Sequence, residues 1–173
     1  MASVTLRPDS IVEASGFTPA VFLGNINDQD PDTGATQNST SAQIVGTFEN
    51  SSDYSGATIT HARLTVQAST SGKASSCEIQ CILADSDGET IQSDSHDFTS
   101  ANESQAGTSV TSGLTPSIVD GMQFILNPDE AGCIVKEVSL VITFTVATPD
   151  PNPAYVLLNS GKYKITAGKV KIL

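Results

Sequence analysis

The chain contains no tryptophan and few other aromatic residues, with six Phe and three Tyr among 173 residues. Sites that bind sugars usually stack the pyranose ring on an exposed aromatic face, and tryptophan serves best. This scarcity leaves Tyr54 and Tyr155, together with Tyr163, as the candidate glycan contacts. Carbohydrate binding is therefore the second hypothesis for this chain and not the first.

Positive charge is also scarce. Eight Lys and Arg stand against nineteen Asp and Glu, for a net charge of −11. Four of the eight lie in Gly161–Leu173, so residues 1–160 alone carry a net charge of −15. Phosphate recognition needs a basic face, which argues against a nucleic-acid partner. An acidic body with a basic end indicates docking, either on a second copy or on an acidic neighbour.

Long apolar runs are absent. No segment approaches the length needed to span a membrane, and no apolar stretch of a secretion signal follows Met1. We therefore expect no membrane partner and synthesis in the cytoplasm.

Cysteine is limited to Cys77, Cys81 and Cys133. Cys77 and Cys81 are four residues apart in a strand-like stretch, about 13 Å, which is too far for a disulfide between them. Either could meet Cys133 on a neighbouring strand. The odd number, without C-x-x-C spacing or a nearby histidine cluster, favours small buried hydrophobic residues in a reducing cytoplasm over a metal site.

What the sequence does contain is alternation of apolar and polar residues with a period of two. It is clearest at Val138–Val146, and it recurs at Ala57–Ser69 with a change of phase near Thr60–Ala62. Further strands are expected at Ser3–Arg7, Ala42–Glu49, Cys77–Leu83, Glu89–Ser93, Thr108–Ser112 and Met122–Leu126. About eight strands without helical crossovers predict an all-β, antiparallel, jelly-roll-like β-sandwich over residues 1–148.

The C-terminal region differs from this body. Pro149, Pro151 and Pro153 predict an extended linker over residues 149–154. Residues 155–173 then form a basic arm, with strands expected at Tyr155–Leu158, Lys162–Thr166 and Lys169–Leu173. In Lys162–Thr166 the lysines fall on one face and apolar residues on the other, which suits addition to a sheet edge. The predicted assembly interface consists of Lys162, Tyr163, Lys164, Ile165, Lys169, Val170, Lys171, Ile172 and Leu173.

Short motifs along residues 3–146 resemble a family of small jelly-roll domains in bacteriophage virion proteins. They are Leu6-Arg7-Pro8-Asp9, Gly16-Phe17-Thr18-Pro19, Asn27–Asp32 before Ala35-Thr36, Ile59–Val66, Leu114–Ile118 and Gly121–Ile125. Phe17 stands where that family usually has tryptophan, and the linker and arm lie outside its pattern. The resemblance implies a sandwich domain of a phage particle.

Two further groups of residues have a functional and a structural interpretation. Asp28, Asp30 and Asp32 alternate as in calcium-binding loops, but the bidentate glutamate of an EF-hand is absent. Asx-rich loops that bond their own backbone are common, so a structural loop is the expected interpretation. His96 lies between Asp94 and Asp97, without the glycines of a nucleophile elbow or the spacing of metal ligands. We expect neither an enzyme nor a cofactor.

These observations predict a non-enzymatic virion protein, a capsid decoration or cement subunit made in the host cytoplasm. Its expected partners are other virion proteins, above all the major capsid protein, and further copies of itself in a homo-oligomer such as a trimer. Assembly would proceed by exchange of the arm or of the N-terminal strand. The alternative is a tail-fibre or receptor- and glycan-binding domain of a phage.

Overall fold

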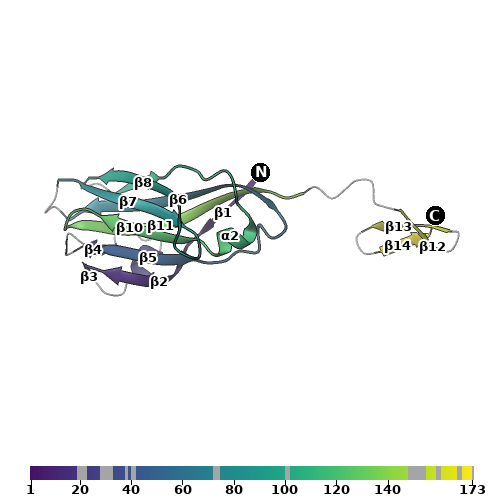
Figure 1. Cartoon of the computed structure of the whole chain (residues 1–173), viewed down its shortest axis with the longest axis horizontal. Coiled ribbons are helices and arrows are strands. Elements are labelled where there is room, and N and C mark those ends of the chain that lie inside the picture. Colours follow the sequence, from purple (N-terminus) through teal and green to yellow (C-terminus); the bar gives the residue numbers. More distant parts are fainter. Residues whose placement is uncertain are drawn as a thin grey trace.

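The computed structural model describes residues 1–18, 23–27, 33–37, 39, 42–71, 75–99 and 102–147. It also describes the backbone of residues 155–158, 161–166 and 169–172. This part of the chain is nearly all β (Figure 1). Its two helices, α1 (Leu23–Ile26) and α2 (Pro116–Asp120), are a single turn each, and no described helix is long and apolar enough to cross a membrane. The all-β prediction is confirmed.

Two antiparallel sheets form the sandwich. Sheet A has the order β3 (Phe17–Thr18), β4 (Ala35–Gln37), β11 (Cys133–Thr145), β6 (Thr58–Thr70) and β9 (Glu103–Ala106), with β1 (Ala2–Leu6) also paired to β11. Sheet B has the order β2 (Pro8–Ser15), β5 (Gln43–Phe48), β10 (Gln123–Pro128), β7 (Cys77–Ala84) and β8 (Thr90–Phe98).

The connections are those of a jelly roll. When the eight strands β4 to β11 are numbered 1 to 8 along the chain, sheet A reads 1-8-3-6 and sheet B reads 2-7-4-5. The first strand thus lies beside the last, the second beside the seventh, and so on inward, which is two interleaved Greek keys. The predicted jelly-roll sandwich is confirmed at the level of strand order.

The N-terminal strands β1 and β2 extend both sheets. Ala2–Leu6 pairs with Phe144–Leu140 of β11 in sheet A, and the chain then crosses to the edge of sheet B, where β2 pairs with β5. A backbone hydrogen bond joins the two residues at this crossing, in which the Glu49 N–H donates to the Arg7 carbonyl at 2.8 Å. Because β1 already occupies its own sheet, exchange of this strand with a neighbour would require its release from β11.

The long strands β6 and β11 form the centre of sheet A. Their inward residues Ala62, Leu64, Val66, Val138, Leu140 and Ile142 are buried in the core. His61 pairs with Thr143 and Ile59 with Phe144, which leaves Thr60 as an extra residue in a β-bulge. This bulge is the physical origin of the phase change expected near Thr60–Ala62.

Several elements differ from the prediction, and β3, β4 and β9 are strands where none was expected. Thr108–Ser112 is not a strand, and Val110 makes only an isolated bridge to Ala62. The edge strand β2 was not expected, because it is mostly exposed and has register shifts after Pro8 and Ile11 that interrupt any alternation. Such irregular edges hinder pairing with other chains.

The cysteine prediction is wrong for two of the three residues. Cys77 at the start of β7 and Cys133 at the start of β11 form a disulfide between the two sheets, with Cα atoms 5.8 Å apart. Cys81 is a free buried thiol, as expected, and burial raises its pKa to about 12. The alternation of apolar residues cannot reveal this pairing, because both partners occupy inward positions like any small core residue.

The three strands expected in the C-terminal arm are present as β12 (Tyr155–Leu158), β13 (Gly161–Thr166) and β14 (Lys169–Ile172). They form an antiparallel sheet of their own in the order β12-β13-β14. The predicted linker, residues 149–154, lies outside the described residues.

Candidate functional site

The outer face of sheet A carries a continuous run of polar residues on β6 and β11. The two strands are antiparallel, and Gln67 pairs with Glu137, Thr65 with Ser139 and His61 with Thr143. Successive residues of a strand alternate between its two faces. Since the residues between these positions build the core, the polar set faces away from it. The run from His61 to Gln67 covers six residues, or about 20 Å.

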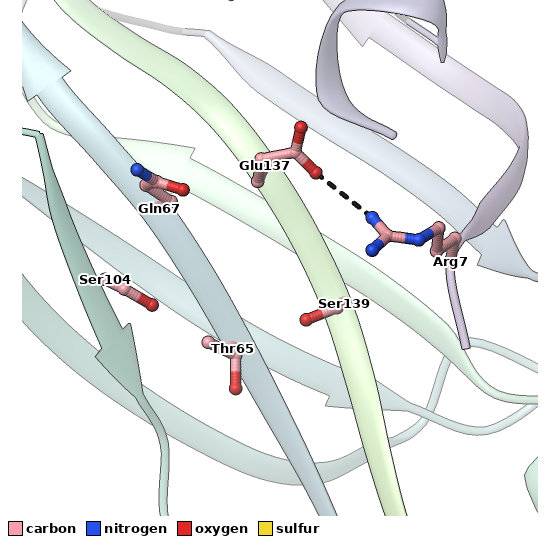
Figure 2. A pocket seen from close by; sticks show the side chains of 6 residues that line it. All are labelled: Arg7, Thr65, Gln67, Ser104, Glu137 and Ser139. Atoms are coloured by element: carbon pink, nitrogen blue, oxygen red, sulfur yellow. Dashed lines mark hydrogen bonds and ion pairs between the residues drawn. The ribbon is translucent and has the colours of Figure 1, made fainter. Parts of the chain in front are cut away.

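A first pocket of about 260 Å³ lies at one end of this face. Its lining residues are Arg7, Thr65, Gln67, Ser104, Glu137 and Ser139 (Figure 2). The Arg7 guanidinium donates to the Glu137 carboxylate at 3.4 Å, and the two side chains are 31% and 15% exposed. Arg7 enters this site because the chain crosses between the sheets at this point, and its backbone N–H is held by the Glu49 carboxylate at 3.1 Å.

A second pocket of about 280 Å³ continues along the same two strands. It is lined by His61, Arg63, Ser109, Val141 and Thr143. Arg63 pairs with Val141 in the ladder, two positions along β6 from Thr65 in the first pocket. His61 Nδ1 lies 3.0 Å from the Thr60 hydroxyl in the bulge, a contact that helps to orient the imidazole ring. The two pockets are therefore consecutive stretches of one polar face.

This face also holds both arginines of the chain, Arg7 and Arg63. Arg7 is paired with Glu137, whereas exposed Arg63 has no ion pair among the described residues. The lining side chains offer guanidinium, amide, carboxylate and hydroxyl groups. They can donate and accept several hydrogen bonds at once, and Val141 is their only aliphatic member.

Neither tyrosine predicted as a glycan contact forms part of this face as described. Tyr54 is fully buried, its ring packs edge-on against Phe144, and its hydroxyl donates to the Asp120 carboxylate at 2.5 Å. Burial and that hydrogen bond raise the pKa of Tyr54 to about 12. The prediction for Tyr54 is therefore wrong, because a ring inside the core cannot stack on a ligand. Tyr155 lies in β12, where only the backbone is described.

The alternative of a calcium site at Asp28, Asp30 and Asp32 stays open, because these three residues lie outside the described residues. Within the described ranges, no group of three His, Cys, Asp or Glu side chains is placed to hold a metal ion. Of the predicted assembly residues, Lys162–Ile165 lie in β13 and Lys169–Ile172 in β14, and Leu173 lies outside the described residues.

Sequence reasoning missed the pockets, although His61 and Arg63 lie in the segment Ala57–Ser69 that it predicted as a strand. The missing information was the pairing of β6 with β11, which sets Thr143 beside His61, and the sheet crossing that brings Arg7 to Glu137. The outward polar positions of two long alternating strands were the available signal.

No protein-family model and no curated protein matches the chain. Among solved structures it is similar to the C-terminal CBM6 of the laminarinase LamC from Zobellia galactanivorans, with a TM-score of 0.47, 10% identity, and coverage of 82% of this chain and 99% of that one. It is also similar to the carbohydrate-binding module CBM6cm-2 of lichenase 5A from Cellvibrio mixtus, solved with cellotriose, with a TM-score of 0.44, 7% identity, and coverage of 84% and 99%.

A third similar structure is the enzymatically active domain of tailspike protein 4 of bacteriophage CBA120. Its TM-score is 0.35 at 11% identity, over 83% of this chain and 19% of that chain. These likenesses are too distant to assign a function, and none of the comparisons identifies a family of phage virion proteins.

Proposed function

We propose that this chain is a non-enzymatic carbohydrate-binding domain whose site is the outer face of sheet A. The observation that carries the proposal is the run of two consecutive pockets along β6 and β11, about 20 Å in extent. A sugar chain presents hydroxyl groups that each donate and accept. A row of amide, hydroxyl, carboxylate and guanidinium groups complements such a ligand.

The composition of this face argues against a protein partner. Cores of protein interfaces are rich in aromatic and apolar anchors, and residues of this kind carry most of the binding energy. Among the described lining residues, Val141 is the only aliphatic one, and none is Phe, Tyr or Trp. Binding would depend on hydrogen bonds that compete with water, each worth about 0.5–1.5 kcal/mol net. We therefore expect modest affinity, with dissociation constants of about 10 μM to 1 mM.

The test compares two glutamine variants. Gln67→Ala removes an amide from the first pocket, and Gln80→Ala removes an amide from the outer face of sheet B, where Gln80 bonds Ser93. We would titrate both variants and the wild type with a panel of neutral and acidic oligosaccharides that includes cellotriose, by calorimetry. The proposal predicts weaker binding only for Gln67→Ala, by about 3- to 10-fold. Equal binding by both variants, or no binding to any sugar, would contradict it.

Assembly on a phage particle through the C-terminal arm is a second candidate function. The observation that favours it is the register of β13 and β14, in which Lys164 pairs with Lys171. The other two lysines of the arm lie two residues away on the same strands, so all four residues share one face of this small sheet. Like charges on directly paired residues of neighbouring strands destabilise a sheet. An acidic partner surface that docks on this face would relieve the repulsion.

A partner that docks on this sheet must be negatively charged, and residues 1–160 of the chain themselves carry a net negative charge. A second copy of the chain meets that requirement, and so would an acidic capsid protein on a phage head. The test is the mass of the full chain by light scattering, beside the variant Lys164→Glu with Lys171→Glu. Self-assembly predicts an oligomer at low salt that the double variant and high salt both reduce to a monomer. A monomer at every salt concentration would contradict self-assembly.

A further inference from the structure

We propose that the second pocket binds an anionic group of the ligand, a carboxylate or a sulfate, so that the glycan recognised by this face is an acidic one. This inference rests on the carbohydrate-binding function proposed above. Its basis is Arg63, which lines this pocket and lies between His61 and Thr65 on the outward face of β6.

The charge of Arg63 is not balanced within the described part of the chain. Arg7 in the first pocket has the Glu137 carboxylate at 3.4 Å, whereas Arg63 has no ion pair with any described residue. In a chain with a net charge of −11, an arginine without a carboxylate beside it is conspicuous. A guanidinium presents a planar set of donors that matches a carboxylate or a sulfate in a two-bond arrangement.

The neighbours of Arg63 complete a site for a small anion. Ser109 and Thr143 add hydroxyl donors, and the imidazole of His61 adds a ring nitrogen. Val141, directly opposite Arg63 in the ladder, contributes an apolar wall. Among the described residues, no acidic side chain lines this pocket, whereas Glu137 lines the first one. The first pocket therefore suits uncharged hydroxyl groups and the second an anion.

The charge of the whole molecule limits the ligand to one with sparse negative charge. Nucleic acids carry a phosphate on every residue, and a polyanion of that density would be repelled by a body of net charge −15. One cationic pocket can accept one anionic group at a time. A glycan with occasional uronic acid or sulfate groups satisfies both conditions.

The experiment uses matched pairs of ligands that differ only in charge. One pair is an otherwise neutral oligosaccharide that carries a single uronic acid and the methyl ester of the same compound, and the other is an oligosaccharide with a single sulfate group and its desulfated form. Calorimetric titration of the full chain at 50 and 150 mM salt would measure each affinity. The inference predicts that the charged member of at least one pair binds about tenfold more tightly, and that salt reduces this preference.

Two arginine variants then locate the preference. Arg63→Gln should abolish the tenfold preference for the charged ligand, while its effect on the neutral member should be no larger than the loss of one hydrogen bond, about 2- to 10-fold. Arg7→Gln should weaken both members of a pair alike, because the charge of Arg7 is already paired with Glu137. Arg63 is exposed, so we expect its variant to keep the melting temperature of the wild type, which circular dichroism would check.

The outcomes separate this inference from the proposed function. Equal binding of charged and neutral members, with Gln67→Ala still weakening both, would overturn the anionic site and leave carbohydrate binding in place. A charge preference that survives Arg63→Gln would also overturn it. If no member of either pair binds and the wider panel also fails, both proposals fall.

Discussion

The Cys77–Cys133 disulfide is expected to contribute about 4 kcal/mol to the free energy of unfolding. The two residues are 56 positions apart in the sequence. Closing a loop of that length in the unfolded chain removes about 14 cal/mol/K of conformational entropy, which corresponds to about 4 kcal/mol at 25 °C. Domains are typically stable by 5–15 kcal/mol, so this single bond would supply a large share of the total.

The assay is urea unfolding of the wild type and of a double variant, Cys77→Ala with Cys133→Ala. The double variant also loses the burial of two sulfur atoms, and the third cysteine supplies the control for that loss. Cys81 is buried to the same degree on the same strand as Cys77 but forms no disulfide. The loss measured for Cys81→Ala, doubled and subtracted, isolates the effect of the cross-link.

Two results would refute this reasoning. If the double variant loses no more free energy of unfolding than twice the loss measured for Cys81→Ala, the cross-link does not restrict the unfolded chain as the loop length requires. If the urea dependence of unfolding does not steepen, the unfolded state has not expanded on losing the bond. In the folded state burial raises the pKa of Cys81 to about 12 and keeps its thiol protonated, but unfolding removes that protection. The assay is therefore run at mildly acidic pH, where the thiol of the unfolded chain is also protonated and exchange is slow.

Two other predictions concern the core. The pKa of Tyr54 is raised to about 12, so above pH 10 the unfolded chain releases the phenolic proton before the folded chain does, and the free energy of unfolding should fall between pH 10 and 12. In thermal melts, Tyr54→Phe should lose less stability than the wild type over this pH range. An equal loss of stability in the two proteins would contradict the raised pKa of Tyr54. A Cβ atom at Gly46 would lie 2.5 Å from Phe124 Cζ and 2.7 Å from the Ser10 carbonyl oxygen. Gly46→Ala should therefore lower the free energy of unfolding, measured in urea, by about 1–3 kcal/mol. An unchanged free energy of unfolding would mean that β5 can shift to make room for the methyl group.

The strands that the sequence predicted best are those with one face in the core and one face exposed. β11 alternates without interruption after Val135, and β6 alternates on either side of the Thr60 bulge as far as Ala68, because the second sheet packs against only one face of each strand. Strands at the edges were harder to predict. β2 is mostly exposed and β9 is a four-residue strand of half-buried and exposed residues, so neither has the buried apolar set on which the prediction depends.

The elements that the sequence placed wrongly depend on contacts between distant residues. The Asp94 carboxylate accepts two hydrogen bonds from Thr108, one from the backbone N–H at 2.9 Å and one from the hydroxyl at 2.8 Å. These two bonds take the place of the backbone pairing that a strand would make. Tyr54 follows a polar loop and looks exposed in the sequence, yet the Asp120 carboxylate at the end of α2 gives its hydroxyl a partner and permits full burial. Local pattern cannot reveal either contact.

The candidate site and the core share the same two strands, and this arrangement explains why the site was difficult to recognise. In β6 and β11 the inward residues carry the stability, since truncating a side chain such as Leu140 costs about 2–5 kcal/mol, whereas outward polar positions cost little when changed. The outward positions are therefore free to hold whatever chemistry a ligand requires. A polar outward row is also what any half-exposed sheet displays, so alternation alone cannot separate a binding face from a solvated one. What sets this face apart is Arg63, which has no ion pair among the described residues and whose pocket has no carboxylate among its described lining residues.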